Sequence, residues 1–148
     1  MIGSHPILLV EDSDEDYEAT VRALKKAGLA NPVMRCADGD ESLDYLYQRG
    51  KYVDPESSPR PGMILLDLNL PGTDGHEVLE DIKANTVLRE IPVIVLTTSS
   101  DEKDIHKCYS SGANSYVVKP VGLPNLIESI QRLKDYWFEV VVLPREVS

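Results

Sequence analysis

Short, largely apolar runs alternate along this chain with segments of helical periodicity, and this alternation restricts the fold more than any other feature. The runs are Ile7–Val10, Val33–Cys36, Met63–Leu68, Val93–Thr97 and Ser115–Lys119. Continuous apolar runs of this length are typical of strands buried on both faces. Five such strands, each followed by an amphipathic helix, predict an α/β fold: a doubly wound, five-stranded parallel sheet with helices on both faces.

Polar residues and glycines indicate where the helices begin and end. Ser13 and Asp16 form a capping-box-like pattern before the first helix, and Ser99 with Glu102 form another before the fourth. Gly28 is expected to end the first helix. The segment 51–62 contains three prolines and two serines, which predicts a surface loop longer than most connections.

The length of 148 residues predicts one domain, which we assign to residues 1–138, followed by a tail at residues 139–148. No apolar run approaches the ~18 residues of a membrane span, and the start of the chain lacks the pattern of a signal peptide. Cys36 and Cys108 form no disulfide framework, which suits the reducing cytoplasm. The histidines His5, His76 and His106 lack paired ligand spacing and are expected at the surface.

The formal net charge is −10, from 25 acidic and 15 basic residues. Nucleic-acid binding depends on basic side chains that neutralise phosphates, so neither DNA nor RNA is an expected partner. A protein partner, a cation or both fit this charge better.

Polar residues gather where the predicted strands end. In an open α/β sheet, the carboxyl ends of the strands form the functional edge. Glu11 and Asp12 follow the first strand, Asp67 ends the third, Thr97 and Thr98 end the fourth, and Lys119 and Pro120 end the fifth. Taken singly, the Asp and Thr residues fit helix caps or turns and Lys119 fits a surface position. Their joint placement at neighbouring strand ends instead predicts a functional site.

Clustered carboxylates repel one another unless a positive charge neutralises them. Hard oxygen ligands suit Mg²⁺, which takes one or two carboxylates together with phosphate oxygens. We therefore expect the site to bind Mg²⁺ and a phosphoryl group, with Asp67 as the attacking carboxylate. Lys119 would neutralise phosphoryl oxygens, and the Thr97 hydroxyl could bond the product.

Four segments together carry a family resemblance: LLVEDSDED, ILLDLNLPGTDG, VIVLTTSS and SYVVKP. With spacings of 30 residues from Asp67 to Thr97 and 52 from Asp67 to Lys119, the chain resembles the response-regulator receiver family, of the CheY type, from about residue 6 to residue 134. The resemblance implies the strand order 2-1-3-4-5. It also implies a signalling domain that catalyses only its own phosphorylation and slow dephosphorylation.

The resemblance assigns roles to individual residues. Asp67 would be the phosphoacceptor and would receive the phosphoryl group from a phosphohistidine of a sensor histidine kinase. The Mg²⁺ ligands would be Glu11, Asp12, Asp67 and the backbone carbonyl of Asn69. Lys119 would bind phosphoryl oxygens and join Pro120 through a cis peptide.

Thr97 and Tyr116 would form the switch pair, with Tyr116 rotating into the space that Thr97 leaves on phosphorylation. Two residues depart from the common family pattern: Glu11 replaces Asp, and Thr98 stands where Ala or Gly is frequent. We expect Glu11 to preserve function and Thr98 to alter the lifetime of the phosphorylated form.

The resemblance also suggests partners. Without a DNA-binding domain in this sequence, output would pass through a protein surface formed by the helix between Ser99 and Gly112, the strand Ser115–Lys119 and the helix that follows. The apolar tail either covers its own domain or, together with this surface, forms a homodimer. The loop YVDPESSPRPG, together with the segment TTSSDEKDIHKCYSSGANSYVVKP, resembles the same parts of single-domain regulators paired with bacterial phytochrome-type histidine kinases, notably cyanobacterial ones.

Three other functions fit this sequence less well. A haloacid-dehalogenase-type phosphatase needs a second aspartate two positions after the nucleophile, where this chain has Asn69. A flavodoxin-like cofactor binder needs a phosphate cradle after the first strand, where this chain has carboxylates. A pseudo-receiver that never takes a phosphoryl group is disfavoured by Asp67, Thr97 and Lys119.

Overall fold

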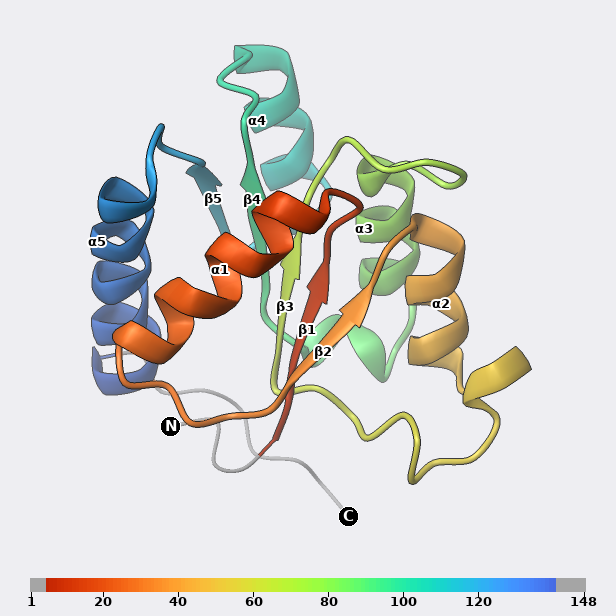
Figure 1. Cartoon of the computed structure of the whole chain (residues 1–148). Helices are drawn as coiled ribbons and strands as arrows, with labels where there is room; N and C mark the ends of the chain where they lie inside the picture. The colour runs from red at the N-terminus through yellow and green to blue at the C-terminus, as the bar shows by residue number, and fades with distance from the viewer. Residues whose placement is uncertain (1–4, 141–148) are drawn as a thin grey trace.

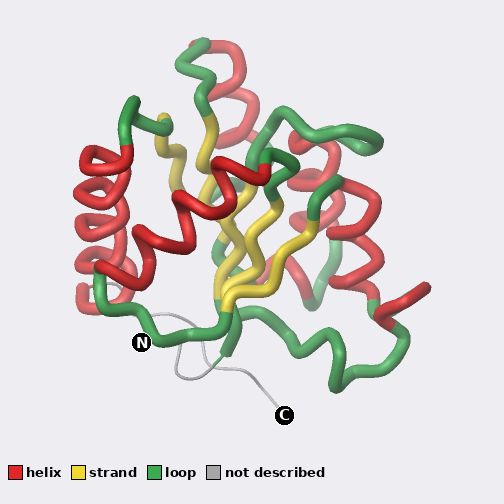
Figure 2. The backbone as a smooth tube through the Cα atoms, in the orientation of Figure 1, coloured by secondary structure: helices red, strands yellow, loops and turns green. Residues whose placement is uncertain are grey.

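The computed structural model describes residues 5–140, with side chains described up to Trp137. Five parallel strands form one sheet in the order β2-β1-β3-β4-β5, which confirms the expected fold and strand order. The strands are β1 (Ile7–Val10), β2 (Val33–Cys36), β3 (Met63–Leu66), β4 (Val93–Thr97) and β5 (Ser115–Val118). The strands occupy the centre of the molecule, and helices cover both faces (Figure 1, Figure 2).

Five α-helices follow the strands in turn. They are α1 (Asp14–Lys26), α2 (Gly39–Tyr47), α3 (Gly75–Ala84), α4 (Glu102–Ser110) and α5 (Leu123–Lys134). Short 3-10 helices occupy Gly50–Tyr52 and Leu88–Glu90, and a π-helical turn, Asp135–Val140, continues α5. No helix in the described part of the chain is both long and apolar enough to cross a lipid bilayer.

Alternate residues of each strand point to opposite faces of the sheet, so the core has two layers. On one face, Ile7 and Leu9 of β1 pack in a cluster with α1 and α5, which contribute Leu24 and Ile130 among others. On the other face, Leu8 and Val10 pack in a cluster with residues of α2, α3 and α4. The three central strands are buried throughout, as their apolar sequence predicted.

The predicted N-terminal cap of the first helix is confirmed in part, and the predicted cap of the fourth helix is wrong. The Ser13 side chain accepts a hydrogen bond from the Asp16 backbone N–H, as an N-cap should. At α4 the N-cap is Asp101, because its carboxylate accepts from the Lys103 N–H, whereas Ser99 lies outside the helix. An aspartate directly before the first turn outcompetes a serine two residues earlier.

The segment between α2 and β3 lies on the surface, as expected, but it is anchored to the domain. The Tyr45 hydroxyl donates a 2.7 Å hydrogen bond to the Pro59 carbonyl. Ser58 is buried, and its hydroxyl donates to the carbonyl of Tyr52. The bond from Tyr45 fixes the loop against α2, and the bond from Ser58 is internal to the loop.

Trp137 is buried in the same cluster as α1 and α5, so this part of the C-terminal segment packs on its own domain. Of the predicted tail at residues 139–148, residues 141–148 lie outside the described residues. The proposed boundary at residue 138 therefore stays a prediction.

Candidate phosphoryl and metal site

The register of the sheet brings the predicted residues to one edge, the upper edge of the sheet in Figure 1. Val10 pairs with Leu66, so the residues that follow, Glu11 and Asp67, lie side by side. The Asp67 N–H donates to the Val10 carbonyl at 3.1 Å, and the Lys119 N–H donates to the Thr97 carbonyl at 2.7 Å. The strands thus hold the backbone of the site directly.

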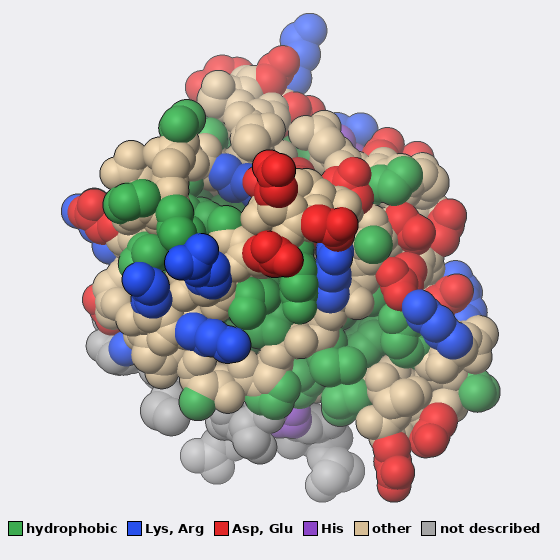
Figure 3. Space-filling view, viewed as in Figure 1, with side chains coloured by type: hydrophobic (Ala, Val, Ile, Leu, Met, Phe, Trp, Pro, Cys, Tyr) green, Lys and Arg blue, Asp and Glu red, His purple; other side chains and the backbone are tan. Residues whose placement is uncertain are grey.

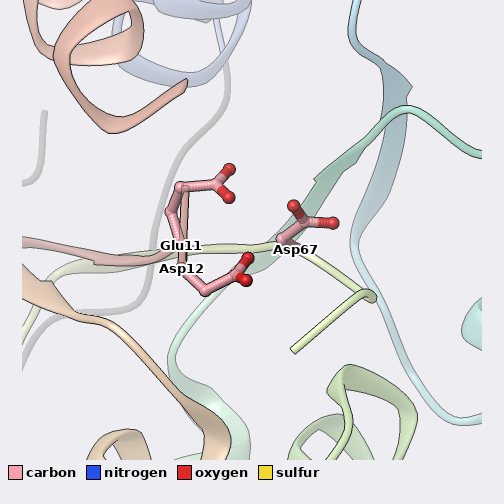
Figure 4. Close-up of side chains that lie close together, drawn as sticks. All are labelled: Glu11, Asp12 and Asp67. Carbon is pink, nitrogen blue, oxygen red and sulfur yellow. The ribbon is translucent and has the colours of Figure 1, made fainter. Parts of the chain in front are cut away.

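Glu11, Asp12 and Asp67 form an acidic cluster in which one oxygen of each carboxylate lies within 4.8 Å of the others. Their side chains come from the ends of β1 and β3 and point toward a shared space (Figure 4). Glu11 and Asp67 are buried, whereas Asp12 is exposed. An acidic cluster that is open on one side and built from hard oxygens fits a divalent cation.

Lys119 joins this cluster from the end of β5. Its Nζ lies 2.5 Å from Glu11 Oε1, 2.9 Å from Asp16 Oδ2 and 3.1 Å from Asp67 Oδ2. Burial alone would lower the pKa of Lys119. Its hydrogen bonds to Glu11 and Asp16 and the charge of Asp67 outweigh that effect and raise the pKa, so the ammonium stays charged.

The single positive charge of Lys119 does not balance the carboxylates of Glu11, Asp12 and Asp67. Burial, together with the nearby charge of Asp67, raises the pKa of Glu11 to about 7, even though the bond from Lys119 lowers it. The cluster therefore carries unbalanced negative charge on poorly solvated oxygens. Three converging carboxylates beside one ammonium therefore fit a divalent metal, independently of any family resemblance.

Thr97 is fully buried, and its Oγ1 is the one buried side-chain polar atom without a hydrogen-bond partner among the described residues. An unpaired buried hydroxyl is costly, so its retention indicates a function. A phosphoryl oxygen at this edge would give that hydroxyl an acceptor. Thr98, the next residue, is exposed at the same edge.

Tyr116 is half-buried on β5 and packs against the core cluster of α2, α3 and α4. Its hydroxyl donates a 2.9 Å hydrogen bond to the carbonyl of Ser99, in the loop between β4 and α4. The ring is therefore already packed inward. The expected rotation of Tyr116 stays a prediction.

Two other predicted features have different outcomes. The Asn69 backbone N–H donates to Asp67 Oδ1 at 3.2 Å, which orients the Asp67 carboxylate. Pro120 follows Lys119, but no cis peptide bond occurs among the described residues, so the expected cis Lys119–Pro120 bond is wrong. Trans is the lower-energy form of an X–Pro bond. With this trans bond, the Lys119 ammonium contacts the carboxylates of Glu11, Asp16 and Asp67.

Sequence reasoning missed three contributors to the site and its surroundings. Asp16 was assigned to a capping box, yet its carboxylate binds Lys119. Arg35 on β2 donates to the backbone carbonyls of Glu11 and Asp12. Gly75 packs so closely that a Cβ would lie 2.3 Å from the Asp67 carbonyl oxygen, so only glycine fits there.

His76 was expected at the surface, and that prediction is wrong. Its side chain is only 14% exposed, and Nε2 lies 3.0 Å from Asp104 Oδ1 on α4. The side chain is covered because α3 packs against α4 at this point. The other oxygen of Asp104 accepts a 2.7 Å hydrogen bond from the Ser99 hydroxyl.

Comparison with known proteins agrees with this geometry. The model of the response regulator receiver domain matches residues 7–131. The chain is 44% identical to the response regulator Rcp1 of Synechocystis sp. over 138 residues, which cover 93% of this chain and 92% of Rcp1. It is 40% identical to a probable methanogenesis regulatory protein, FilR2, of Methanothrix harundinacea, over 88% of this chain and 82% of FilR2.

Solved structures give the same result. The Mn²⁺-bound form of Rcp1 superimposes with a TM-score of 0.86 at 42% identity, covering 95% of this chain and 99% of that one. The phosphorylated cyanobacterial phytochrome response regulator RcpA gives 0.89 at 38% identity, covering 97% and 100%. The chain therefore belongs to the response regulator receiver family and is a receiver domain of two-component signalling.

Proposed function

We propose that Asp67 accepts a phosphoryl group from a phosphohistidine of a sensor histidine kinase, and that the phosphorylated domain signals through a protein surface. One observation carries this proposal. Asp67 lies at the end of the central strand β3, within 3.1 Å of the Lys119 ammonium and beside two other carboxylates. A nucleophile, a fixed cation and a metal-binding acidic cluster in one place are the parts that phosphoryl transfer to a carboxylate needs.

We propose Glu11, Asp12, Asp67 and the Asn69 backbone carbonyl as the ligands of a Mg²⁺ ion. When bound, Mg²⁺ supplies the positive charge that offsets the acidic cluster and attracts phosphoryl oxygens. The fit rests on the three converging carboxylates and their unbalanced charge. The Mn²⁺-bound structure of Rcp1 supports a divalent cation in this family.

Residues of this chain carry out each part of the proposed transfer. An Asp67 carboxylate oxygen forms the new O–P bond, and the P–N bond of the phosphohistidine breaks, with its electron pair returning to the imidazole. Lys119 neutralises charge on the phosphoryl oxygens, and Thr97 donates its unpaired hydroxyl to one of them. Slow hydrolysis of the acyl phosphate would later restore the Asp67 carboxylate.

We further propose a phytochrome-type histidine kinase in the cytoplasm as the donor. RcpA is a cyanobacterial phytochrome response regulator, and the chain is also 44% identical to the bacteriophytochrome response regulator AtBRR, with a TM-score of 0.72 over 95% of this chain and 98% of AtBRR. Transfer from a phosphorylated bacteriophytochrome kinase should outpace transfer from an unrelated histidine kinase. Equal rates from both would contradict this assignment.

The output surface that we propose comprises α4, β5 and α5, with homodimer formation through this surface and the tail. Tyr109 and Val118 support it, because both are large apolar side chains that are exposed there. Sedimentation of the chain shortened to residue 140, which keeps buried Trp137, tests the role of the tail. If the shortened chain sediments as the same oligomer as wild type, the tail has no role in the dimer. If Val118→Asp sediments like wild type, the surface of α4, β5 and α5 does not form the dimer.

Incubation with acetyl phosphate and Mg²⁺, read by intact mass, tests the central proposal. Wild type should gain one phosphoryl group, and Asp67→Asn should gain none. Asp101→Asn is a matched control, since Asp101 caps α4 outside the site, and it should be modified like wild type. Labelling of Asp67→Asn to the wild-type extent would contradict the proposal.

A further inference from the structure

Asp16 contacts the site from a helix rather than from a strand end. Its Oδ2 lies 2.9 Å from Lys119 Nζ and links the first turn of α1 to the end of β5, 103 residues away in sequence. In a complete capping box, the Asp16 side chain would accept from the Ser13 N–H. Here that N–H instead donates to Glu11 Oε2 at 3.2 Å, which leaves the Asp16 carboxylate for Lys119.

The Lys119 ammonium has no donor to spare. A lysine ammonium carries three N–H donors. Glu11, Asp16 and Asp67 each hold one carboxylate oxygen within hydrogen-bond distance of Nζ. If Asp67 becomes phosphorylated, as proposed above, its own bond to Lys119 can pass to the phosphoryl group. A second bond from Lys119 to the phosphoryl oxygens then requires Glu11 or Asp16 to give up its bond.

Burial decides which carboxylate gives up its bond most easily. The Glu11 side chain is 2% exposed, so it would lose its partner in a place that water reaches poorly. The Asp16 side chain is 44% exposed, so water can replace Lys119 there at small cost. The acidic first turn of α1 indeed faces solvent, as the acidic side chains over the N-terminal half of α1 in Figure 3 show.

We propose that Asp16 is a positioning residue that competes with the phosphoryl group for Lys119 and thereby lowers the affinity of the site for that group. In the unphosphorylated protein, Asp16 holds the ammonium at the mouth of the site. Phosphorylation transfers that donor to the phosphoryl oxygens and releases the first turn of α1 from β5. This inference rests on the proposed function and adds a residue to it.

The chain offers a matched control at the neighbouring position. Glu15 is exposed in the same helical turn and carries the same charge, and Lys119 has no bond to it. Glu15→Gln removes one negative charge near the site without touching Lys119, whereas Asp16→Asn removes the charge and the ion pair. Asp16→Glu keeps the carboxylate and serves as the conservative rescue.

Beryllofluoride, a phosphoryl analogue, is titrated into the full chain at fixed Mg²⁺, and its apparent Kd is measured by calorimetry. Asp16→Asn should bind about threefold to tenfold more tightly than wild type, the range between an exposed ion pair and a charge-assisted hydrogen bond. Glu15→Gln should stay within about twofold of wild type, and Asp16→Glu should return toward wild type. In metal-free protein, the NMR signal of the Lys119 ammonium should shift in Asp16→Asn and not in Glu15→Gln.

The outcomes separate this inference from the proposal on which it rests. Equal Kd changes in Asp16→Asn and Glu15→Gln, or weaker binding by Asp16→Asn with unchanged unfolding free energy, would overturn the role of Asp16 and leave Asp67 as the acceptor. Absence of binding by wild type, or equal binding by Asp67→Asn, would overturn the proposed function itself.

Discussion

The Tyr116 hydroxyl donates a 2.9 Å hydrogen bond to the Ser99 carbonyl, and so ties β5 to the loop that leads from β4 into α4. Ser99 also donates its own hydroxyl to Asp104 on α4. The position of the Tyr116 ring is therefore coupled to the start of α4, which belongs to the proposed output surface.

Tyr116→Phe should lower the free energy of unfolding by about 1 kcal/mol, because the half-buried Ser99 carbonyl loses its donor. Urea denaturation measures this change. Tyr47→Phe is the control, since its hydroxyl makes only an exposed contact of 3.5 Å with Asp81 and should cost less than about 0.5 kcal/mol. Equal costs for the two variants would contradict the structural importance of the Tyr116 bond.

Thr97→Val should leave the unphosphorylated protein as stable as wild type, or more so, because the Thr97 hydroxyl is buried without a partner among the described residues. Phosphorylation of this variant by acetyl phosphate should be about tenfold less favourable than that of wild type, since the proposed hydrogen-bond donor to a phosphoryl oxygen is absent. Denaturation and acetyl phosphate labelling measure the two effects. A loss of more than about 1 kcal/mol in stability would mean that the hydroxyl has a structural role instead.

Thr98→Ala should change the rate at which the phosphorylated form decays, because Thr98 is exposed and directly follows Thr97, at the edge of the sheet that carries Asp67. A change of about twofold to tenfold corresponds to about 0.4–1.4 kcal/mol in the barrier. Ser100→Ala, which removes an exposed hydroxyl two residues later, should decay like wild type. Identical lifetimes for wild type and Thr98→Ala would refute this role.

The pH dependence of stability should report Glu41, whose carboxylate accepts bonds from the Ala37 N–H, the Tyr52 hydroxyl and the Lys51 ammonium. Burial alone would raise the pKa of Glu41, but these bonds together lower it below the ordinary 4.5. A lowered pKa means that the stabilisation is complete above pH 4.5 and is lost as the pH falls through the lower, folded-state value.

Glu41→Gln should therefore cost about 1 kcal/mol at pH 7, and the difference from wild type should shrink as the pH falls from 4.5 through the lowered pKa of Glu41. Urea denaturation at a series of pH values measures both proteins. A difference that stays constant down to pH 3 would contradict the assignment of the stabilisation to the charged carboxylate.

The fold and the centre of the site could be predicted from the sequence because both follow from local patterns and one geometric rule. Apolar runs identify strands, and parallel strands bring their carboxyl ends to one edge. Glu11, Asp67 and Lys119 each directly follow a strand, and Asp12 comes one residue after Glu11, so their meeting required no knowledge of side-chain conformation.

Other features depend on which of several partners a side chain selects, and the sequence does not contain that choice. The position of Asp16 in the sequence fits a capping box, but in the structure the Ser13 N–H donates to Glu11 instead. His76 lacked any sequence signal because its partner, Asp104, lies 28 residues away on another helix. The conformation of the Lys119–Pro120 bond is set by small energy differences that the residue pair alone does not fix.

The identity of the phosphorylated residue tests the account most directly. After reaction with acetyl phosphate and Mg²⁺, borohydride reduces an aspartyl phosphate to homoserine, and peptide mapping then locates the modified residue. We expect homoserine at position 67 and at no other aspartate. Modification at Asp12 or Asp16, or a phosphoryl group found on a histidine, would contradict this assignment.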